Sequence, residues 1–266
     1  MKDTPPQGSP WWGTTEFTEG AAKRWDIGPL SLWVRRLANE WWIAFERDES
    51  KRERLVTAAE HAGVDWLEQA GLERYLTRQA QPLLHITPVL ADRPVVTRPM
   101  VPFHVCPGEE TRLFVSLPVW IRLEAGVQKL LLKEIAIQRL SDTWFGPSTL
   151  EGELGYASTT HCRRDLREVP VYPYRAVTPV LIQNASKQTL VMERLSLPVD
   201  YLAVYGSEEA RLWTSTVGVK WEQGSTVVVD IGDKPPAEAG KAQRLCGPRR
   251  EHEKGGVIRA VASLFG

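Results

Sequence analysis

Residues 113–123 read Leu-Phe-Val-Ser-Leu-Pro-Val-Trp-Ile-Arg-Leu, and every second position of this stretch is apolar. Successive side chains of a β-strand point to opposite faces, so a period of two places one row of side chains on a buried face. The apolar row consists of Leu113, Val115, Leu117, Val119, Ile121 and Leu123. Similar runs, broken by Pro and Gly, continue between residues 83 and 231, and together they predict a mainly β protein.

A second run of the same kind begins 80 residues later. Ser116-Leu117-Pro118-Val119 recurs there as Ser196-Leu197-Pro198-Val199, and Gly126 recurs as Gly206. We interpret the echo as two related β-sandwich-like modules, which arose by duplication or share only the general pattern of such sandwiches. Proline inside both runs favours a sheet edge or a bulge at that position.

Two shorter patterns precede the first run. Alternating apolar residues on either side of Ala38-Asn39 predict a β-hairpin over residues 30–45. Residues 51–79 instead carry Leu55, Ala59, Ala62 and Trp66 at helical spacing, with Leu72, Tyr75 and Leu76 as a second stripe, and this spacing predicts a small helical insertion.

The last ten residues have a helical stripe of their own. Val257, Ile258, Val261, Leu264 and Phe265 would share one face, which predicts a short C-terminal amphipathic helix. This face could dock on its own domain, on a partner protein or on a membrane surface, and the pattern does not choose between them. Residues 241–266 hold six Lys and Arg against two Glu, a local excess that favours an acidic surface.

These patterns divide the chain into five regions. They are an irregular lead-in (1–26), a first β module with the helical insertion (27–140), a junction with a second β module (141–232), a flexible linker (233–256) and the amphipathic tail (257–266).

Composition bounds the location and the partners of the protein. The 266 residues include 33 Lys and Arg and 33 Asp and Glu, and this balance argues against a dedicated nucleic-acid binder. Three scattered cysteines do not form a disulfide framework, and the first residues lack the apolar core of a signal peptide. No run of about 18 apolar residues occurs, so we expect a cytoplasmic protein without a membrane span.

The junction at 141–157 is the most promising place for a ligand or partner site. It holds no phosphate-binding loop and no nucleophile motif, so we expect neither a catalytic residue nor a cofactor. Its aromatics could fill the joint between two sheets or line a cleft, and two of its carboxylates could act as the acid and base of a glycoside hydrolase. The candidate residues are Asp142, Trp144, Phe145, Glu151, Glu153 and Tyr156.

A metal site is the weaker candidate. His104 and Cys106 would point to one face of a strand, and His161 and Cys162 are adjacent, so imidazole and thiolate groups are available for zinc. Their spacing fits no known finger or ribbon. We therefore favour a half-buried strand cysteine and surface histidines, with no bound metal.

Several motifs of the second half resemble the domain of unknown function 432 family of archaea and bacteria. They are Thr143-Trp144-Phe145-Gly146-Pro147, Gly152-x-x-Gly155-Tyr156-Ala157, Arg175-Ala176-Val177-Thr178-Pro179-Val180, Ile182-x-Asn184 and Leu195-Ser196-Leu197-Pro198-Val199, with Ile27-Gly28-Pro29-Leu30 and Glu40-Trp41 before them. The resemblance covers about residues 27–231 and carries no assigned chemistry. It also implies a gene setting beside small mechanosensitive channels, and hence a channel-type partner.

The sequence thus favours a non-catalytic cytoplasmic interaction or regulatory protein that acts at the membrane face. The alternative is a small-molecule or carbohydrate-binding protein, or a hydrolase, with its site at the module junction.

Overall fold

The computed structural model describes residues 10–51, 56–60, 71–146, 148–222, 226–251 and 258–261. Within these ranges the chain forms β-strands and short 3-10 turns and no α-helix, which confirms the mainly β class. The chain divides into two compact units whose segments alternate along the sequence. Unit 1 consists of Met1–Val89, Val119–Gln138 and Tyr172–Tyr174, and unit 2 of Leu90–Pro118, Arg139–Val171 and Arg175–Gly266.

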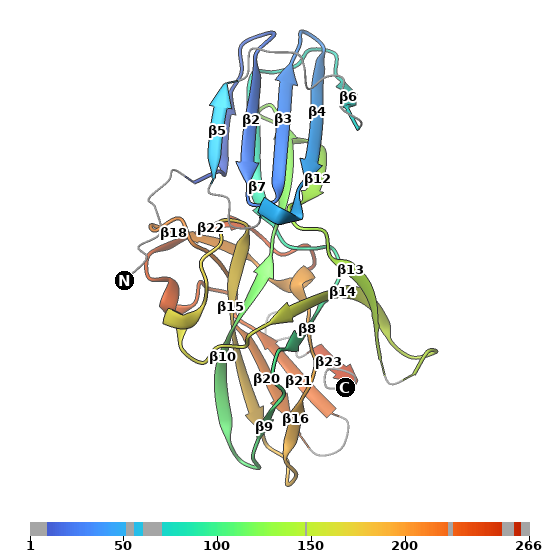
Figure 1. Ribbon diagram of the computed structural model, residues 1–266, viewed down its shortest axis with the longest axis vertical. Helices are drawn as coiled ribbons and strands as arrows, with labels where there is room; N and C mark the ends of the chain where they lie inside the picture. Colours follow the sequence, from blue (N-terminus) through green and yellow to red (C-terminus); the bar gives the residue numbers. More distant parts are fainter. Residues whose placement is uncertain are drawn as a thin grey trace. The chain divides into compact units, whose positions relative to one another are not determined.

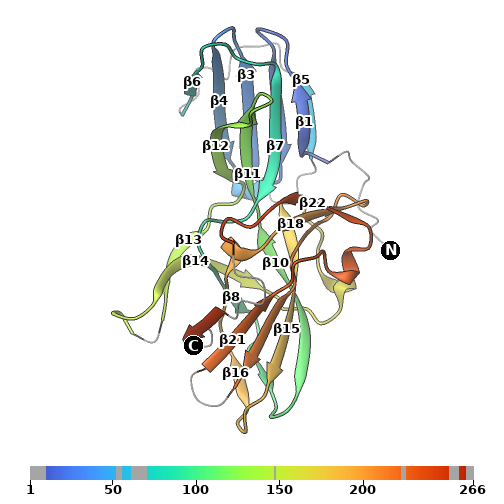
Figure 2. The same cartoon turned by 180° about the vertical axis from the view of Figure 1, so that it is seen from behind.

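Unit 1 consists of two antiparallel sheets that lie face to face (Figures 1 and 2). One sheet has the order β1 (Gly13–Glu16), β7 (Leu83–Val89), β11 (Trp120–Ala125) and β12 (Leu130–Ala136). The other has the order β5 (Thr57–Glu60), β2 (Ala22–Ile27), β3 (Leu30–Arg36), β4 (Glu40–Arg47) and β6 (Glu73–Leu76). A 3-10 turn, η1 (Glu49–Lys51), follows β4.

The hairpin expected over residues 30–45 is confirmed as β3 and β4, which pair in register from Leu30↔Arg47 to Arg36↔Trp41. Its alternation produces the core, because the residues on one face are fully buried. Trp41 belongs to this face, whereas Trp42 points to the other face and stacks against Arg35 and Arg74. The buried residues of the hairpin face are Leu30, Leu32, Val34, Trp41 and Ile43.

The helical insertion predicted for residues 51–79 is wrong wherever the structure describes it. Residues 57–60 are β5, which pairs with β2, and residues 73–76 are β6, which pairs with β4. In the strand, Tyr75 is half-buried while Leu76 is 77% exposed, so the apolar pair taken for a helical stripe points to two sides. Each segment pairs with an outer strand of the sheet, and this pairing decides that it is a strand. The local spacing of apolar residues does not reveal such a pairing. Residues 52–55 and 61–70 lie outside the described ranges.

The lead-in and the linker also contain regular structure. β1 and most of β2 lie within residues 1–26, and Trp11 is buried there, with Nε1 donating to the carbonyl oxygen of Pro173 at 2.7 Å. Residues 233–256, expected to be a flexible linker, include η5 (Ala237–Ala239) and β22 (Ala242–Cys246). The strands in both segments pair with neighbouring strands: β1 with β7, β2 with β3, and β22 with β18. The Pro- and Gly-rich composition of the segments does not reveal this pairing.

The predicted C-terminal helix is wrong at residues 258–261, which form the strand β23 (Ile258–Val261) on the edge strand β21. Val257, Leu264 and Phe265 lie outside the described residues. Ile258 and Val261 are β-branched and favour a strand, and the open edge of β21 with which the segment pairs is not visible in the local sequence.

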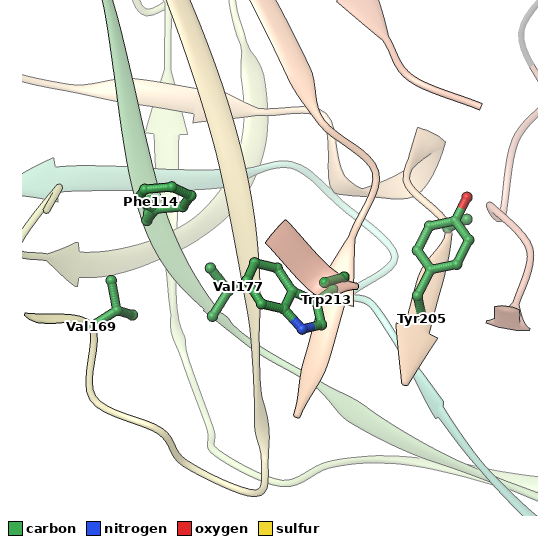
Figure 3. Packing of buried hydrophobic residues seen from close by; sticks show 7 residues of the cluster. Phe114, Val169, Val177, Tyr205 and Trp213 are labelled. Carbon is green, nitrogen blue, oxygen red and sulfur yellow. The ribbon is translucent and has the colours of Figure 1, made fainter. Parts of the chain in front are cut away.

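Unit 2 is built around an eight-stranded sheet. Its main path is β22, β18 (Val204–Ser207), β19 (Leu212–Thr214), β15 (Arg175–Asn184), β20 (Val217–Trp221), β21 (Thr226–Ile231) and β23. The long strand β10 (Glu110–Pro118) pairs antiparallel along β15. Figure 3 shows Phe114, Val177, Trp213 and Tyr205 of four of these strands packing with Val169 into one buried cluster.

Two smaller sheets complete unit 2. A four-stranded sheet has the order β13 (Ser141–Phe145), β14 (Glu153–Thr160), β8 (Val95–Pro99) and β17 (Leu195–Leu197). A two-stranded sheet consists of β16 (Leu190–Met192) and β9 (Phe103–Val105). The 3-10 turns η3 (Leu166–Glu168) and η4 (Val199–Tyr201) connect the strands.

The two echoed sequences have different surroundings. Ser116, Leu117 and Pro118 end the nine-residue strand β10, and Val119 leads into β11 of unit 1. Leu195–Leu197 form the short strand β17, after which the chain enters the turn η4. All six apolar residues of the alternating row at 113–123 are buried, as expected, but β10 and β11 belong to different units.

Candidate functional site

The stretch expected to be a junction is a β-hairpin within unit 2. β13 and β14 pair antiparallel, and β14 pairs parallel with β8. β13 is the last strand of its sheet, so one side of its backbone has no neighbouring strand within the described residues. Figure 1 shows the hairpin projecting from the rest of unit 2.

The outer face of the hairpin is aromatic and apolar. Trp144 lies directly opposite Leu154, and Asp142 directly opposite Tyr156, so these four side chains share one face. Trp144 is 45% exposed and Leu154 is 44% exposed. Leu150, in the connecting turn, is 93% exposed. Exposed apolar side chains grouped on one hairpin are typical of a binding surface.

The turn holds the Trp144 ring in place. Its Nε1 donates to the carbonyl oxygen of Ser148 at 2.8 Å, and the Ser148 hydroxyl accepts from the backbone N–H of Leu150 and of Glu151. A Cβ at Gly152 would lie 2.9 Å from that Nε1 and 2.5 Å from the carbonyl oxygen of Phe145. Glycine at this position is therefore required for the turn to pack beside the ring.

Tyr156 and Asp142 join the hairpin to the loop before β8. The Tyr156 hydroxyl donates to Asp92 Oδ1 at 2.9 Å, and Arg93 lies over the Tyr156 ring, 5.5 Å from its centre. Nη1 of Arg93 also lies 3.4 Å from Asp142 Oδ1. Burial and the carboxylate of Asp92 raise the pKa of Tyr156 to about 12, so the phenol is neutral and acts as a donor at physiological pH.

The inner face of the hairpin carries Phe145 and Glu153, which are direct cross-strand partners. Phe145 is buried, with the guanidinium of Arg194 5.4 Å from its ring centre. The carboxyl group of Glu153 accepts a hydrogen bond from Ser196 and lies close to Asp200. Partial burial and the charge of Asp200 raise the pKa of Glu153.

Asp200 is the most deeply buried carboxylate of this region. Its side chain is 4% exposed, and its Oδ2 lies 3.2 Å from Nε of Arg250. Burial raises the pKa of Asp200, and the positive charge of Arg250 opposes part of that rise. Its Oδ1 has no hydrogen-bond partner in the described part of the chain.

The structure separates the residues that the sequence grouped together. Asp142 and Glu153 are on opposite faces of the hairpin, so they do not form an acid and base pair on a common substrate. Glu151 is exposed in the turn, and Phe145 belongs to the core. Trp144 and Tyr156 do share a face.

Among the tail candidates, only Ile258 and Val261 lie within the described residues, in β23. The possible metal ligands are distributed over separate elements: His104 is exposed in β9, Cys106 follows it, and His161 and Cys162 follow β14. Burial raises the pKa of Cys162 to about 11, which disfavours the thiolate that zinc needs. Within the described residues, no group of three His, Cys, Asp or Glu side chains could hold a metal ion.

Sequence reasoning missed the partners of the hairpin, namely Asp92, Arg93, Asp200 and Arg250. They come from three distant segments, and the local patterns around Asp92, Arg93 and Asp200 do not indicate a partner. The basic excess after residue 241 was the one available signal, since Arg250 belongs to it and binds an acidic side chain of its own unit.

Within the described part of the chain, no helix has the length and apolar character needed to span a membrane.

Comparison with known proteins identifies the family alone. No curated protein and no solved structure matches the chain. A family model described as "Protein of unknown function (DUF432)" matches residues 11–265, which is nearly the whole length. The chain therefore belongs to the DUF432 family.

Proposed function

We propose that this protein is a non-catalytic interaction protein that binds a protein partner through the outer face of the β13–β14 hairpin. The observation that carries the proposal is the exposure of Trp144, Leu150 and Leu154 together on a hairpin with an open edge. Trp, Tyr and Arg are enriched among the residues that dominate protein interfaces, and Tyr156 and Arg93 lie beside Trp144 on this surface.

The hairpin favours an extended and basic partner segment. The exposed edge of β13 can accept a further strand, whose main chain supplies hydrogen bonds and whose alternate side chains reach Trp144. Residues 141–160 include Asp142, Glu151 and Glu153 and no Lys or Arg, so the hairpin as a whole is acidic and favours basic side chains on the partner. On its outer face Asp142 is paired with Arg93, and Glu151 is exposed in the turn.

This chemistry is compatible with a channel-type membrane protein as the partner. Segments beside the membrane spans of such proteins carry an excess of Lys and Arg on the cytoplasmic side and lie next to apolar sequence. We accordingly place the protein in the cytoplasm at the membrane face. Support for the channel itself comes from the family resemblance, and support for a basic and apolar segment comes from the hairpin.

Site-specific photo-crosslinking tests the proposal. A benzophenone amino acid replaces Leu154, which is 44% exposed, and in a matched control it replaces Val191 of β16, which is 43% exposed. We expect one discrete adduct with a channel-type membrane protein at position 154 and none at position 191. Trp144→Ala should reduce the adduct at least tenfold, because truncation of a central interface Trp typically costs about 2 kcal/mol or more.

Two results would contradict this assignment. Equal labelling from positions 154 and 191 would show that the hairpin is an ordinary surface. Loss of all labelling on addition of a soluble oligosaccharide would favour the alternative function, a carbohydrate site on Trp144 and Tyr156.

A further inference from the structure

The segment after β22 folds back on the turn η4. The backbone N–H groups of Arg249 and Arg250 both donate to the carbonyl oxygen of Asp200, at 2.8 and 2.9 Å. The side chain of Arg249 donates from Nε to the carbonyl oxygen of Leu90 at 2.9 Å. These bonds fix the backbone of both arginines and direct the Arg250 side chain to the carboxylate of Asp200.

The ion pair has one buried and one exposed member. The side chain of Asp200 is 4% exposed, whereas that of Arg250 is 65% exposed, so the cation approaches a buried anion from the surface. Arg250 also donates a side-chain hydrogen bond to Tyr201. Guanidinium groups commonly bind a carboxylate through two parallel hydrogen bonds. Since Oδ1 of Asp200 has no hydrogen-bond partner among the described residues, the carboxylate is used at only one oxygen.

The surroundings of Asp200 hold more negative than positive charge. Asp92 and Glu153 both act on the charge of Asp200, as do Arg249 and Arg250. Counting Asp200 itself, three carboxylates and two guanidinium groups act on one another's charge here, and the negative excess becomes larger when Arg250 leaves. A metal ion does not fit, since the described acidic residues form no group that could hold one. The chemistry that this site demonstrably accepts is an arginine side chain.

We propose that Glu153, Ser196, Asp200 and Tyr201 form a binding site for an arginine side chain, which Arg250 occupies within the chain and which an arginine of the bound partner takes over. The inference rests on the proposed function, which brings a basic segment to the same hairpin. Glu153 and its neighbour in sequence, Leu154, lie on the inner and outer faces of the same strand β14, so a partner segment on the outer face reaches the arginine site by passing around an edge of the hairpin. The segment around residue 250 therefore competes with the partner.

N-acetyl-L-argininamide is a suitable probe, with N-acetyl-L-citrullinamide as the uncharged control. Arg250→Ala in the full chain vacates the site, and Arg167→Ala is the matched control because Arg167 is an exposed arginine paired with Asp165 elsewhere in unit 2. Binding is followed by amide chemical shifts of residues 153–155, 196–197 and 199–201. We expect the probe to bind the Arg250→Ala chain at least tenfold more tightly than the unchanged chain or the Arg167→Ala chain.

Removal of the site should abolish that gain. Asp200→Asn in the Arg250→Ala background should lose the binding, and Glu153→Gln should weaken it, because it removes a negative charge beside Asp200. Equal affinity of the probe for the unchanged and the Arg250→Ala chains would overturn the arginine site, as would equal shifts with the citrulline control.

The crosslinking experiment separates this inference from the proposed function. In the Arg250→Ala chain the adduct at position 154 should form in higher yield, because the competitor is gone, and an unchanged or lower yield would overturn the competition. If the adduct fails to form in every variant while the probe binds as expected, the proposed function falls and the arginine site stands.

Discussion

Gly28 shows how a single residue is fixed by packing within unit 1. Its φ is +53°, a left-handed conformation, and a Cβ there would lie 2.3 Å from two ring atoms of Tyr174. Gly20 also has a positive φ, +82°, but a Cβ at that position would meet nothing within 4 Å. A substitution at Gly20 therefore tests backbone strain alone, whereas one at Gly28 tests strain together with a steric clash.

We expect Gly28→Ala to lower the free energy of unfolding by about 2–5 kcal/mol, because backbone strain and overpacking add. Gly20→Ala should cost only the strain, about 1–2 kcal/mol. Chemical denaturation of both variants measures the difference. Equal losses would contradict the contact between Gly28 and Tyr174.

Tyr156 provides a prediction about pH. Its pKa rises from 10.0 to about 12 on folding, so the folded state holds the phenolic proton more tightly than the unfolded state does. The stabilisation that this proton provides is complete below pH 10 and is lost as the pH rises from 10 to 12. Ultraviolet absorbance of the phenolate should show a titration near pH 12 that Tyr156→Phe removes.

Asp92→Asn is the matched change for that titration. It leaves the ring half-buried but removes the carboxylate that accepts the hydrogen bond of the Tyr156 hydroxyl, so the titration should move to lower pH. An unchanged titration in this variant would show that burial alone sets the pKa of Tyr156.

At the scale of elements, strand β6 distinguishes a strand from the helix expected of its sequence. Leu76 is 77% exposed at the edge of its sheet, whereas Ile43 of the neighbouring strand β4 is fully buried. A helix with an apolar stripe would instead have buried Leu76 with Leu72 and Tyr75.

Leu76→Ala should therefore change the free energy of unfolding by less than about 0.5 kcal/mol, as is usual for surface positions. Ile43→Ala should cost about 2–5 kcal/mol, because it leaves a cavity between two sheets. Thermal or urea unfolding measures both. A large loss in Leu76→Ala would contradict the strand at 73–76.

Strands were predictable from the sequence where the alternation of apolar residues was long and the two faces of the strand differed in polarity. The β3–β4 hairpin and the buried alternation of 113–123 are of this kind, since each residue's burial follows from its own position in a strand. β5, β6 and β23 are four residues long, and β22 is five, so too few positions exist for a period to be recognised. These strands form because an edge of a sheet is available, which is a property of the tertiary structure.

At the scale of the whole molecule, the two units share one chain whose segments alternate. β7 ends unit 1's first segment at Val89, and β11 begins near the start of its second segment, at Trp120. Val89 and Trp120 are direct partners in the antiparallel register. A two-residue Asn-Gly turn can therefore join them and omit residues 90–119.

We expect the joined chain, residues 10–89, Asn-Gly and 120–138, to fold with a cooperative thermal transition followed by circular dichroism. Its stability should be lower than that of unit 1 in the full chain, because Pro173 and Tyr174 are missing. Residues 10–89 alone should not fold, since β7 then lacks β11 and exposes the apolar side chains Leu84 and Ile86. Folding of that shorter chain would contradict the dependence of unit 1 on its second segment.

The candidate site combines both kinds of information. The sequence indicated residues 141–157, with Trp144, Tyr156, Asp142 and Glu153, because aromatics and acids there occur between two β-rich regions. Which face each side chain occupies depends on the register of β13 and β14, and a shift of one residue would exchange the two faces. That register places Asp142 and Glu153 on opposite faces of the hairpin.

The sequence by itself determined the β class, the hairpin at 30–45 and the burial of the alternating row at 113–123, because these depend on the local alternation of apolar side chains. Tertiary structure alone decided that β10 and β11 of that row belong to different units and that Arg250 meets Asp200. Pairing partners of a strand are chosen by backbone hydrogen bonds and burial over the whole chain, and an alternating pattern is equally satisfied by any sheet that covers it.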